Sequence, residues 1–491
     1  MHRSYRGAMA TDDPADPGLP IKLNPCSNGE YPPRAVTPLV RETVRRARGL
    51  CDERARRLGM DRRAFLLSTM GAATTLATLA ACSSDQSGGG SGGTYDVPEE
   101  AGTDPDAATE ALGGPGPVID VQTHFLEYPA GTGAGMGSSF PQARCGEADP
   151  ADCFRTDAWI DEVFGRSDTT LAVLSAVPVV AGADPMSADL MSRARERLVE
   201  RCGEGRVLVQ GHGVPNVGEL PAALAAMEDE AARFPLVAWK SYTHVGRPWR
   251  LDDADPEGLQ VGEAYLAKVV ELGVDVVCVH KGLSDGHPFA SPADIGPAAA
   301  AHPDLRFCVY HAGFESRVTE AGYDAGSPNG GADRLLLSLE RAGIEPGANV
   351  YAELGSTWRT VMGSPDEAAH LLGKLLVAVG EDRVLWGTDS IWYGSPQDQI
   401  QAFRTFEISE ELQDRYGYPA LTDAVKEKVL WRNAAALYDV DPEELPCDLR
   451  PGEQEEARGA VAGDNRTFGP TTAEAASRLF LAEHPWAAAS Y

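Results

Sequence analysis

The sequence predicts an α/β protein whose main domain is a (β/α)8 TIM barrel over residues 117–440, and two observations lead to this fold class. From Pro117 onward, short β-rich runs alternate with Ala-, Leu- and Glu-rich amphipathic segments, which indicates a parallel sheet with helical crossovers. Polar side chains also follow the apolar runs at their C-terminal ends, where barrel enzymes build their sites. A doubly wound open sheet is the structural alternative, but no Gly-rich dinucleotide turn follows an early strand.

The barrel elements are expected in alternation along the chain. Each predicted strand is a short run rich in Val, Ile and Leu, and each predicted helix repeats apolar residues at three- and four-residue spacing. The strands are predicted at 118–122, 170–177, 206–211, 236–240, 274–280, 305–311, 349–353 and 383–389. The helices between them are predicted at 188–202, 218–233, 257–272, 331–342 and 365–379.

Four further segments flank the barrel. Residues 1–60 are an N-terminal extension with an Arg-rich, helix-like stretch at 38–58, and Met60 is an alternative start of the protein. Residues 61–82 are predicted to be an export signal and residues 83–116 a flexible linker. Residues 441–491 are an acidic C-terminal extension interrupted by Pro and Gly. The sequence leaves open whether the N-terminal extension or the internal start is real.

The export prediction depends on two adjacent arginines. Arg62 and Arg63 precede a weakly apolar run that ends Leu-Ala-Ala-Cys82. Twin arginines before such a run resemble a Tat signal, and small residues before a cysteine resemble a bacterial lipobox. The run is too short and too rich in Ala and Thr to span a bilayer. We therefore expect a bacterial lipoprotein, exported by the Tat machinery and anchored in the membrane through Cys82 on the outer face. A buried Ala-rich helix is the alternative.

The composition excludes one class of partner. The 491-residue chain carries a formal net charge of −30, whereas residues 1–82 hold 13 Lys and Arg against 8 Asp and Glu. An acidic surface of this kind argues against nucleic-acid binding and leaves a small-molecule substrate, with a homo-oligomer open. Cys145 and Cys153 lie in one Gly-rich loop and are candidates for a disulfide in an oxidising compartment.

Residues that carry chemistry stand at the ends of six predicted strands. A strand alternates its faces, so Gln122 and His124 of the first strand point to the same side. A single buried histidine is usually a satisfied core residue, but several independent strands that end in polar side chains indicate a site. The strand-end residues are Gln122, His124, Lys240, His280, His311, Glu353 and Asp389.

Four of these strand ends carry a resemblance to a known family. The runs Asp-Val-Gln-Thr-His124-Phe, Val-Cys-Val-His280-Lys, Tyr-His311-Ala-Gly and Leu-Trp-Gly-Thr-Asp389-Ser resemble the amidohydrolase-related family, near the branch of aminocarboxymuconate semialdehyde decarboxylase. The resemblance covers roughly residues 117–440. It implies a metal-dependent barrel enzyme of the amidohydrolase superfamily.

The resemblance also implies roles for individual residues. Gln122, His124, His280 and Asp389 would hold one divalent metal ion, and His311 would be the acid/base group, with Asp389 as the alternative base. Two imidazoles and a carboxylate leave an open position, at which a metal lowers the pKa of bound water from about 15.7 towards 7. A nearby imidazole exchanges protons at neutral pH.

Gln122 departs from the His-x-His pair that many metal-dependent barrels place on this strand. An amide oxygen is a poorer zinc ligand than imidazole, although it suits harder ions such as Mn²⁺ or Mg²⁺. Zn²⁺ is the first expectation from the histidine and aspartate ligands, and Mn²⁺, Mg²⁺ and Fe²⁺ are alternatives because of Gln122. Two other interpretations stay open: Gln122 bonds only water or substrate beside the metal, or the site is metal-free.

Substrate contacts are expected beyond the fourth strand. Lys240 either binds a substrate carboxylate or forms a salt bridge inside the barrel mouth, for instance to Glu353. His244 stands in a loop of cationic and aromatic residues that would suit an aromatic or carboxylated ligand. Lys240, His244 and Glu353 are the candidate substrate-binding residues.

These observations predict an exported, metal-dependent hydrolase that attacks a small amide, ester or lactone with metal-activated water. Non-oxidative decarboxylation of an aromatic or enoic acid is the close alternative, because the same ligands serve both reactions. A catalytically inactive, ligand-binding barrel is the third interpretation, in which Gln122 marks the loss of chemistry.

Overall fold

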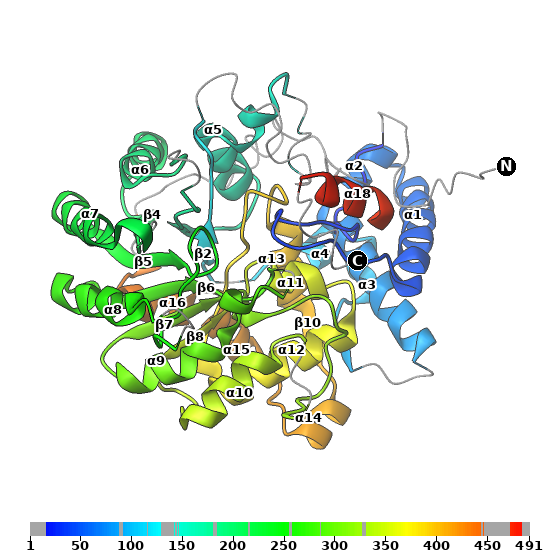
Figure 1. Ribbon diagram of the computed structural model, residues 1–491. Helices are drawn as coiled ribbons and strands as arrows, with labels where there is room; N and C mark the ends of the chain where they lie inside the picture. The colour runs from blue at the N-terminus through cyan, green and yellow to red at the C-terminus, as the bar shows by residue number, and fades with distance from the viewer. Residues whose placement is uncertain are drawn as a thin grey trace.

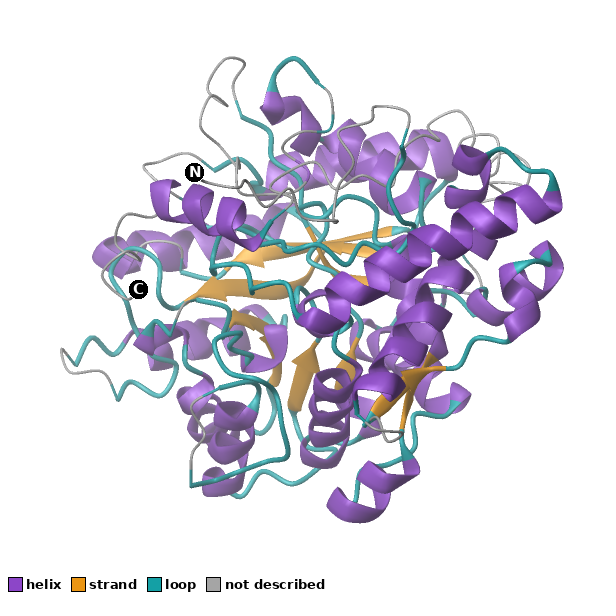
Figure 2. Ribbon diagram, turned by 90° about the vertical axis from the view of Figure 1, so that its right-hand side faces the viewer, coloured by secondary structure: helices purple, strands orange, loops and turns teal. Residues whose placement is uncertain are grey.

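The computed structural model describes most of the chain outside its two ends. The described residues are 16–87, 92–114, 116–128, 142, 145, 147–179, 184–214, 217–254, 258–284, 286–326, 330–442, 445 and 472–483. The strands of the main domain gather at the centre of the molecule and helices surround them (Figure 2).

Eight parallel strands form the barrel in chain order, so the predicted fold class is confirmed. Backbone hydrogen bonds from Val121 N to Trp386 O and from Asp389 N to Gln122 O, both 3.0 Å, connect the last strand to the first. The strands are β2 Ile119–Thr123, β3 Leu171–Leu174, β4 Val207–His212, β5 Leu236–Tyr242, β6 Val276–His280, β7 Arg306–Tyr310, β8 Val350–Glu353 and β9 Val384–Leu385.

The helices around the barrel follow the predicted alternation (Figure 1). The helix predicted at 188–202 is α6 Ala188–Cys202, which begins at the N-cap Ser187 and ends at Gly203. The other predicted helices shorten by one to four residues at an end. They are α7 Leu220–Arg233, α8 Val261–Leu272, α10 Asp333–Ala342 and α12 Pro365–Ala378, with α9 Ile295–Ala301, α13 Gln397–Thr405 and α16 Asn433–Tyr438 completing the outer layer.

The N-terminal region is folded against the barrel. Helices α1 Pro38–Leu58 and α3 Thr69–Gln86 lie side by side, with the short α2 Arg62–Leu66 between them in the chain (Figure 1). Cys82, the predicted lipidation site, is 1% exposed on α3, a helix that packs against α4 Pro105–Leu112. The structure thus shows the buried Ala-rich helix that the sequence left as the alternative, while export and lipid anchoring stay predictions.

The flexible linker predicted at 83–116 is wrong for its described part from residue 92. Strand β1 Gly93–Tyr95 pairs antiparallel with β10 Phe406–Ile408, and a 3-10 turn and α4 follow it. Tyr95 is 3% exposed, because its ring packs edge-on against Phe406. The Gly- and Ser-rich sequence just before residue 92 predicted a flexible linker. It carries no signal for β1, because β1 pairs with a strand far along the chain.

Three smaller features complete the fold. Cys145 and Cys153 form a disulfide, in agreement with the pairing that the sequence suggested. Within the C-terminal extension, helix α18 Ala473–Glu483 buries Phe480 completely. Among the described residues, no helix has both the length and the apolar character that crossing a membrane requires.

Candidate metal centre

Two strand ends of the barrel turn their side chains inward through unusual backbone conformations. His311 follows β7 with φ 60°, and Asp389 lies beyond β9 with φ 59°. Left-handed backbone at a residue other than glycine is strained and is found most often at functional sites. The Glu353 carboxylate accepts a hydrogen bond from His311 N at 2.9 Å and helps to hold that turn.

The first cluster joins β2 to the chain after β9. His124 Nε2 lies 3.0 Å from Asp389 Oδ1, and Gln122 Nε2 donates to the same oxygen at 3.1 Å. Gln122 Nε2 also lies 3.4 Å from His124 Nε2. Three of the four predicted ligands are therefore in direct contact.

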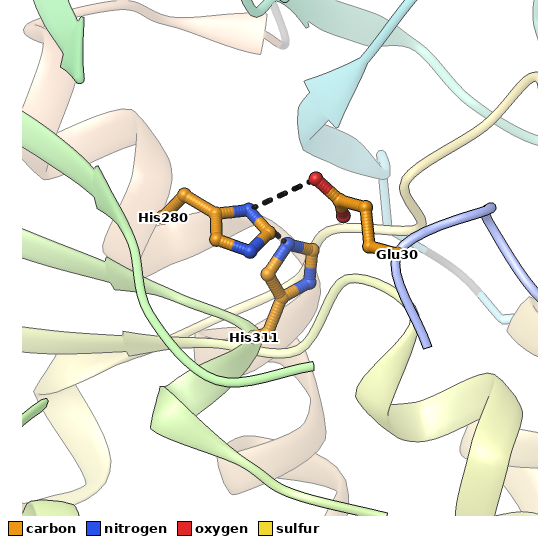
Figure 3. Close-up of side chains that lie close together, drawn as sticks. All are labelled: Glu30, His280 and His311. Atoms are coloured by element: carbon orange, nitrogen blue, oxygen red, sulfur yellow. Dashed lines mark hydrogen bonds and ion pairs between the residues drawn. The ribbon is translucent and has the colours of Figure 1, made fainter. Parts of the chain in front are cut away.

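The second cluster contains the fourth predicted ligand, the predicted acid/base group and a residue from the N-terminal segment. His280 Nδ1 lies 3.2 Å from His311 Nε2 and 3.7 Å from Glu30 Oε1 (Figure 3). One ligand atom from each of these three side chains lies within 4.8 Å of the others. This is the spacing that a single cation could bridge.

Asn28 links the two clusters. Its side-chain Nδ2 donates to Asp389 Oδ2 at 2.9 Å and to Glu30 Oε2 at 2.6 Å. Gly29 between the two residues has φ 87°, and this tight turn directs both neighbouring side chains into the barrel mouth. The N-terminal segment thus contributes directly to the site.

The three histidines share one arrangement of their ring nitrogens. In each ring one nitrogen faces a backbone carbonyl: His124 Nδ1 lies 2.7 Å from Ser175 O, His311 Nδ1 lies 2.7 Å from Gly355 O, and His280 Nε2 lies 3.2 Å from Gly282 O. A carbonyl accepts only from N–H, so the other nitrogen of the neutral His280 and His311 rings turns a lone pair into the site, whereas His124 Nε2 faces the Asp389 carboxylate. A backbone acceptor behind an inward-facing lone pair is the usual environment of metal-binding histidines.

Burial sets the charge states of the site. The pKa of Asp389 is lowered to about 2, because hydrogen bonds and the charges of His311 and His124 outweigh its burial. Burial and the neighbouring Asp389 raise the pKa of Glu30 to about 8. Burial lowers the pKa of His311 to about 4, so its ring is neutral at pH 7.

The donor set fits a divalent cation. Inward lone pairs of His280 and His311 that face each other at 3.2 Å repel, and a cation between them would remove the repulsion. Gln122 Oε1 is buried and has no hydrogen-bond partner among the described residues. Amide oxygen and nitrogen are told apart only by their hydrogen bonds, so a half-turn of this amide would present the oxygen to an ion. Imidazole and carboxylate donors suit Zn²⁺, Mn²⁺ or Fe²⁺.

A family comparison assigns this barrel. The model of the amidohydrolase family matches residues 119–440, which include every barrel strand. The chain belongs to the amidohydrolase family. A comparison with curated proteins finds no match.

Solved structures of similar proteins span about two thirds of this amidohydrolase. The 2,6-dihydroxybenzoate decarboxylase from Rhizobium is 16% identical, with a TM-score of 0.37 over 66% of this chain and 98% of that one. An uncharacterised TIM-barrel protein from Bordetella bronchiseptica is 14% identical, with a TM-score of 0.43 over 65% and 97%. The 5-carboxyvanillate decarboxylase from Novosphingobium aromaticivorans, in complex with manganese, is 12% identical, with a TM-score of 0.40 over 67% and 97%.

Lys240 forms no ion pair in the described part of this amidohydrolase, although the charges of Asp389, Glu353 and Glu30 reach it and favour its charged form. Its side chain is buried, its Nζ donates no hydrogen bond there, and it forms no salt bridge with Glu353. Instead, Nζ lies 3.6 Å from the ring centre of Tyr310 and 4.8 Å from that of Tyr242. Burial lowers the pKa of Lys240 to about 8, which still leaves it mostly charged at pH 7.

The other two predicted substrate contacts, His244 and Glu353, differ in what they touch. The His244 ring centre lies 4.8 Å from that of His280, and its buried Nδ1 has no partner among the described residues. Glu353 points elsewhere: its two oxygens accept from His311 N and Gly355 N, at 2.9 and 2.5 Å. The carboxylate therefore holds the backbone behind the site, and its role in substrate binding stays a prediction.

Sequence reasoning missed Asn28 and Glu30. Both lie in a stretch without periodic pattern, upstream of the apparent export signal, and nothing local connects them to the barrel. The motif Ser-Asn-Gly-Glu-Tyr31 was the available signal, because a polar Asn-Gly turn between Leu23 and the buried Tyr31 is typical of an ordered loop.

Proposed function

We propose that this amidohydrolase removes the carboxyl group of a small aromatic or enoic acid in a metal-dependent, non-oxidative decarboxylation. The observation that carries the proposal is the buried Lys240 ammonium, which forms no ion pair in the described structure. An unpaired buried charge is costly, and an anionic substrate would compensate it. Nζ lies over the faces of two tyrosine rings, so an aromatic acid held by Nζ would lie in aromatic surroundings.

Hydrolysis, the first expectation from the sequence, receives less support from Asp389. Asp389 is the alternative base to His311, and a base that takes a proton from water needs a free lone pair. Both of its oxygens are also engaged. Oδ1 accepts from Gln122 and Trp392, and Oδ2 accepts from Asn28 and Ser356. Such a carboxylate is suited to holding a cation and poorly suited to taking a proton.

We assign a separate role to each group of residues from its position in the site. Gln122, His124, His280 and Asp389 would hold the divalent ion, which when bound draws electron density from a coordinated substrate oxygen. Lys240 Nζ binds an anionic oxygen of the acid and fixes its orientation. His311 Nε2 takes up a proton and returns it to the substrate carbon, where C–H replaces C–CO₂⁻ and CO₂ leaves. Its neutral ring is held for this transfer by the Nδ1 contact with Gly355 O.

The proposal is tested by product analysis. Metal-loaded protein is incubated with a panel of hydroxybenzoic and enoic acids and, separately, with esters, lactones and amides, and CO₂ release and hydrolysis are measured. We expect CO₂ release from at least one acid. Hydrolysis of an ester, lactone or amide without CO₂ release from any acid would reverse the choice, and binding of acids without turnover would indicate the inactive barrel.

Lys240→Met provides the matched variant. The isosteric loss of charge is expected to raise KM for the acid by about 10- to 100-fold, the loss expected for a charge-assisted hydrogen bond, while the metal content stays at the wild-type level. Lys281→Met is the control, since Lys281 is equally buried but is paired with Asp294 at 2.8 Å. An unchanged KM in Lys240→Met would show that Lys240 does not bind the acid, and would contradict the proposal.

A further inference from the structure

We propose that Glu30 is a ligand of the metal ion and supplies the negative charge that Gln122 cannot provide. The inference depends on the divalent metal of the proposed function, but not on the reaction assigned to it. It makes the N-terminal segment, here residues 16–37, a permanent part of the metal centre.

The position of Glu30 is built by the chain around it. Its backbone N–H donates to Asn28 Oδ1 at 3.0 Å, and its Oε2 accepts from Asn28 Nδ2 at 2.6 Å. The second oxygen, Oε1, is the one that faces His280 Nδ1. One carboxylate oxygen is therefore held in place, and the other is directed at a metal-binding nitrogen. This division is typical of a ligand supported by an outer hydrogen bond.

The segment that carries Glu30 is fixed to the barrel mouth on both sides of the site. Lys22 Nζ donates to Tyr393 O at 3.1 Å and to Ser395 O at 2.7 Å, and forms an ion pair with Asp398 at 3.4 Å. On the other side, Tyr31 is 1% exposed and its Oη lies 3.1 Å from Tyr393 Oη. The carboxylate is consequently presented from a fixed backbone.

Charge explains why a second carboxylate is needed. Gln122, His124, His280 and Asp389 together carry a single negative charge, so a divalent ion held by them alone would leave a net positive charge in a buried site. Uncompensated buried charge is unfavourable. As a carboxylate bound to the ion, Glu30 makes the ligand set neutral with a divalent ion, as a glutamate at position 122 would. The amide at 122 and the carboxylate at 30 thus form a complementary pair.

The arrangement has a consequence for processing of the chain. Cleavage before Cys82, which a lipoprotein signal requires, would remove Asn28 and Glu30 from the barrel mouth. The metal centre with Glu30 and a chain processed at Cys82 are mutually exclusive. The buried position of Cys82 on α3 agrees with the intact chain.

Metal affinity tests the inference independently of turnover. The full-length protein is stripped of metal, and the dissociation constants of Mn²⁺ and Zn²⁺ are measured by calorimetry for wild type, Glu30→Gln, Gln122→Glu and the double variant. Glu30→Gln preserves shape and the bond from Asn28, so it removes only charge. We expect it to weaken Mn²⁺ binding by at least about 100-fold, because loss of a charged ligand costs more than the roughly 10- to 100-fold seen when outer-shell partners are removed. Glu42→Gln, on the exposed surface of α1, is the control and should leave Kd unchanged.

The double variant shows whether Glu30→Gln weakens metal binding through the lost charge or through a disturbance of the structure around residue 30. With the carboxylate moved to position 122, we expect Glu30→Gln/Gln122→Glu to recover at least about 10-fold of the lost affinity, which is a coupling between the two sites. Unchanged Kd in Glu30→Gln would overturn the inference, and so would a double variant no tighter than Glu30→Gln. Thermal unfolding of the metal-free proteins verifies that each variant is folded. Either failure leaves the CO₂ assay on wild-type protein unaffected, so the two proposals fail separately.

Discussion

The barrel and the N-terminal segment both place side chains in the same site, but they reach it by different physical routes. The barrel residues stand at strand ends, where the hydrogen-bonded register of eight strands determines their positions. Residues 16–37 have no regular secondary structure, and individual side-chain contacts hold them. The barrel residues of the candidate centre are therefore positioned by the strand topology, whereas Asn28 and Glu30 are positioned by a few side-chain contacts that single substitutions can remove.

His311→Asn provides the largest expected effect and tests the barrel half. If His311 transfers protons, turnover falls by about 10²- to 10⁴-fold, the usual contribution of a general acid or base, and bound metal remains at wild-type level. Turnover and metal content of the same preparation are the measurements. Loss of metal together with activity would instead place His311 in the ligand set with His280 and Glu30, and the division between the two clusters would disappear.

Lys22→Met tests the contacts that hold the N-terminal segment, residues 16–37, against the barrel. The substitution leaves the buried Asp398 carboxylate without its cation, and we expect a local loss of about 1–3 kcal/mol. Hydrogen exchange should therefore accelerate in residues 19–31 while β6 and β7 stay protected. Lys268→Met is the control, because Lys268 pairs with the exposed Glu228 and Glu271 on the outer surface. Equal acceleration in the barrel strands would show that segment and barrel unfold as one unit.

His212 allows a smaller test within the barrel wall, away from the metal centre. Its ring lies 3.5 Å from Asp184 and 3.4 Å from Glu230, and these carboxylates raise its pKa to about 10 against the opposing effect of burial. A pKa raised on folding contributes stability that is fully present below the unfolded value of about 6.5 and is lost as pH rises towards 10.

The corresponding measurement is the free energy of unfolding as a function of pH. Wild type should exceed His212→Gln by about 1–2 kcal/mol at pH 6, a modest value because both carboxylates retain some solvent contact. The difference should shrink towards pH 10. A constant difference across this range would mean that the ring is neutral and acts through packing alone.

The regular part of the fold could be predicted because its signals are local. The 3.6-residue period of α6 and the apolar run of β6 are present within each segment, and the prediction for α6 matches the structure at both ends. The strand predicted at 383–389 ends early, as β9 Val384–Leu385, although Trp386 O and Asp389 N still bond to residues of β2. The pairing of β1 with β10 had no local signal, since each strand is three residues long.

Some residues of the candidate site could likewise be predicted from local sequence signals, and others could not. Gln122, His124, His280, His311 and Asp389 could be found from sequence, because each follows a recognisable strand. The direction of Glu353 towards backbone amides could not be found, since it depends on the turns at His311 and Gly355. The unpaired state of Lys240 also required knowledge of what surrounds its Nζ.

The sequence by itself determined the barrel, its family and the candidate ligands at the strand ends, because periodic burial and strand ends are properties of contiguous residues. Only the tertiary structure decided that α3 is a buried helix in the folded chain and that Asn28 and Glu30 stand beside Asp389 and His280. Those contacts join residues separated by more than 200 positions, and no local pattern encodes such a separation. The apparent leader and the metal centre are connected only through the fold.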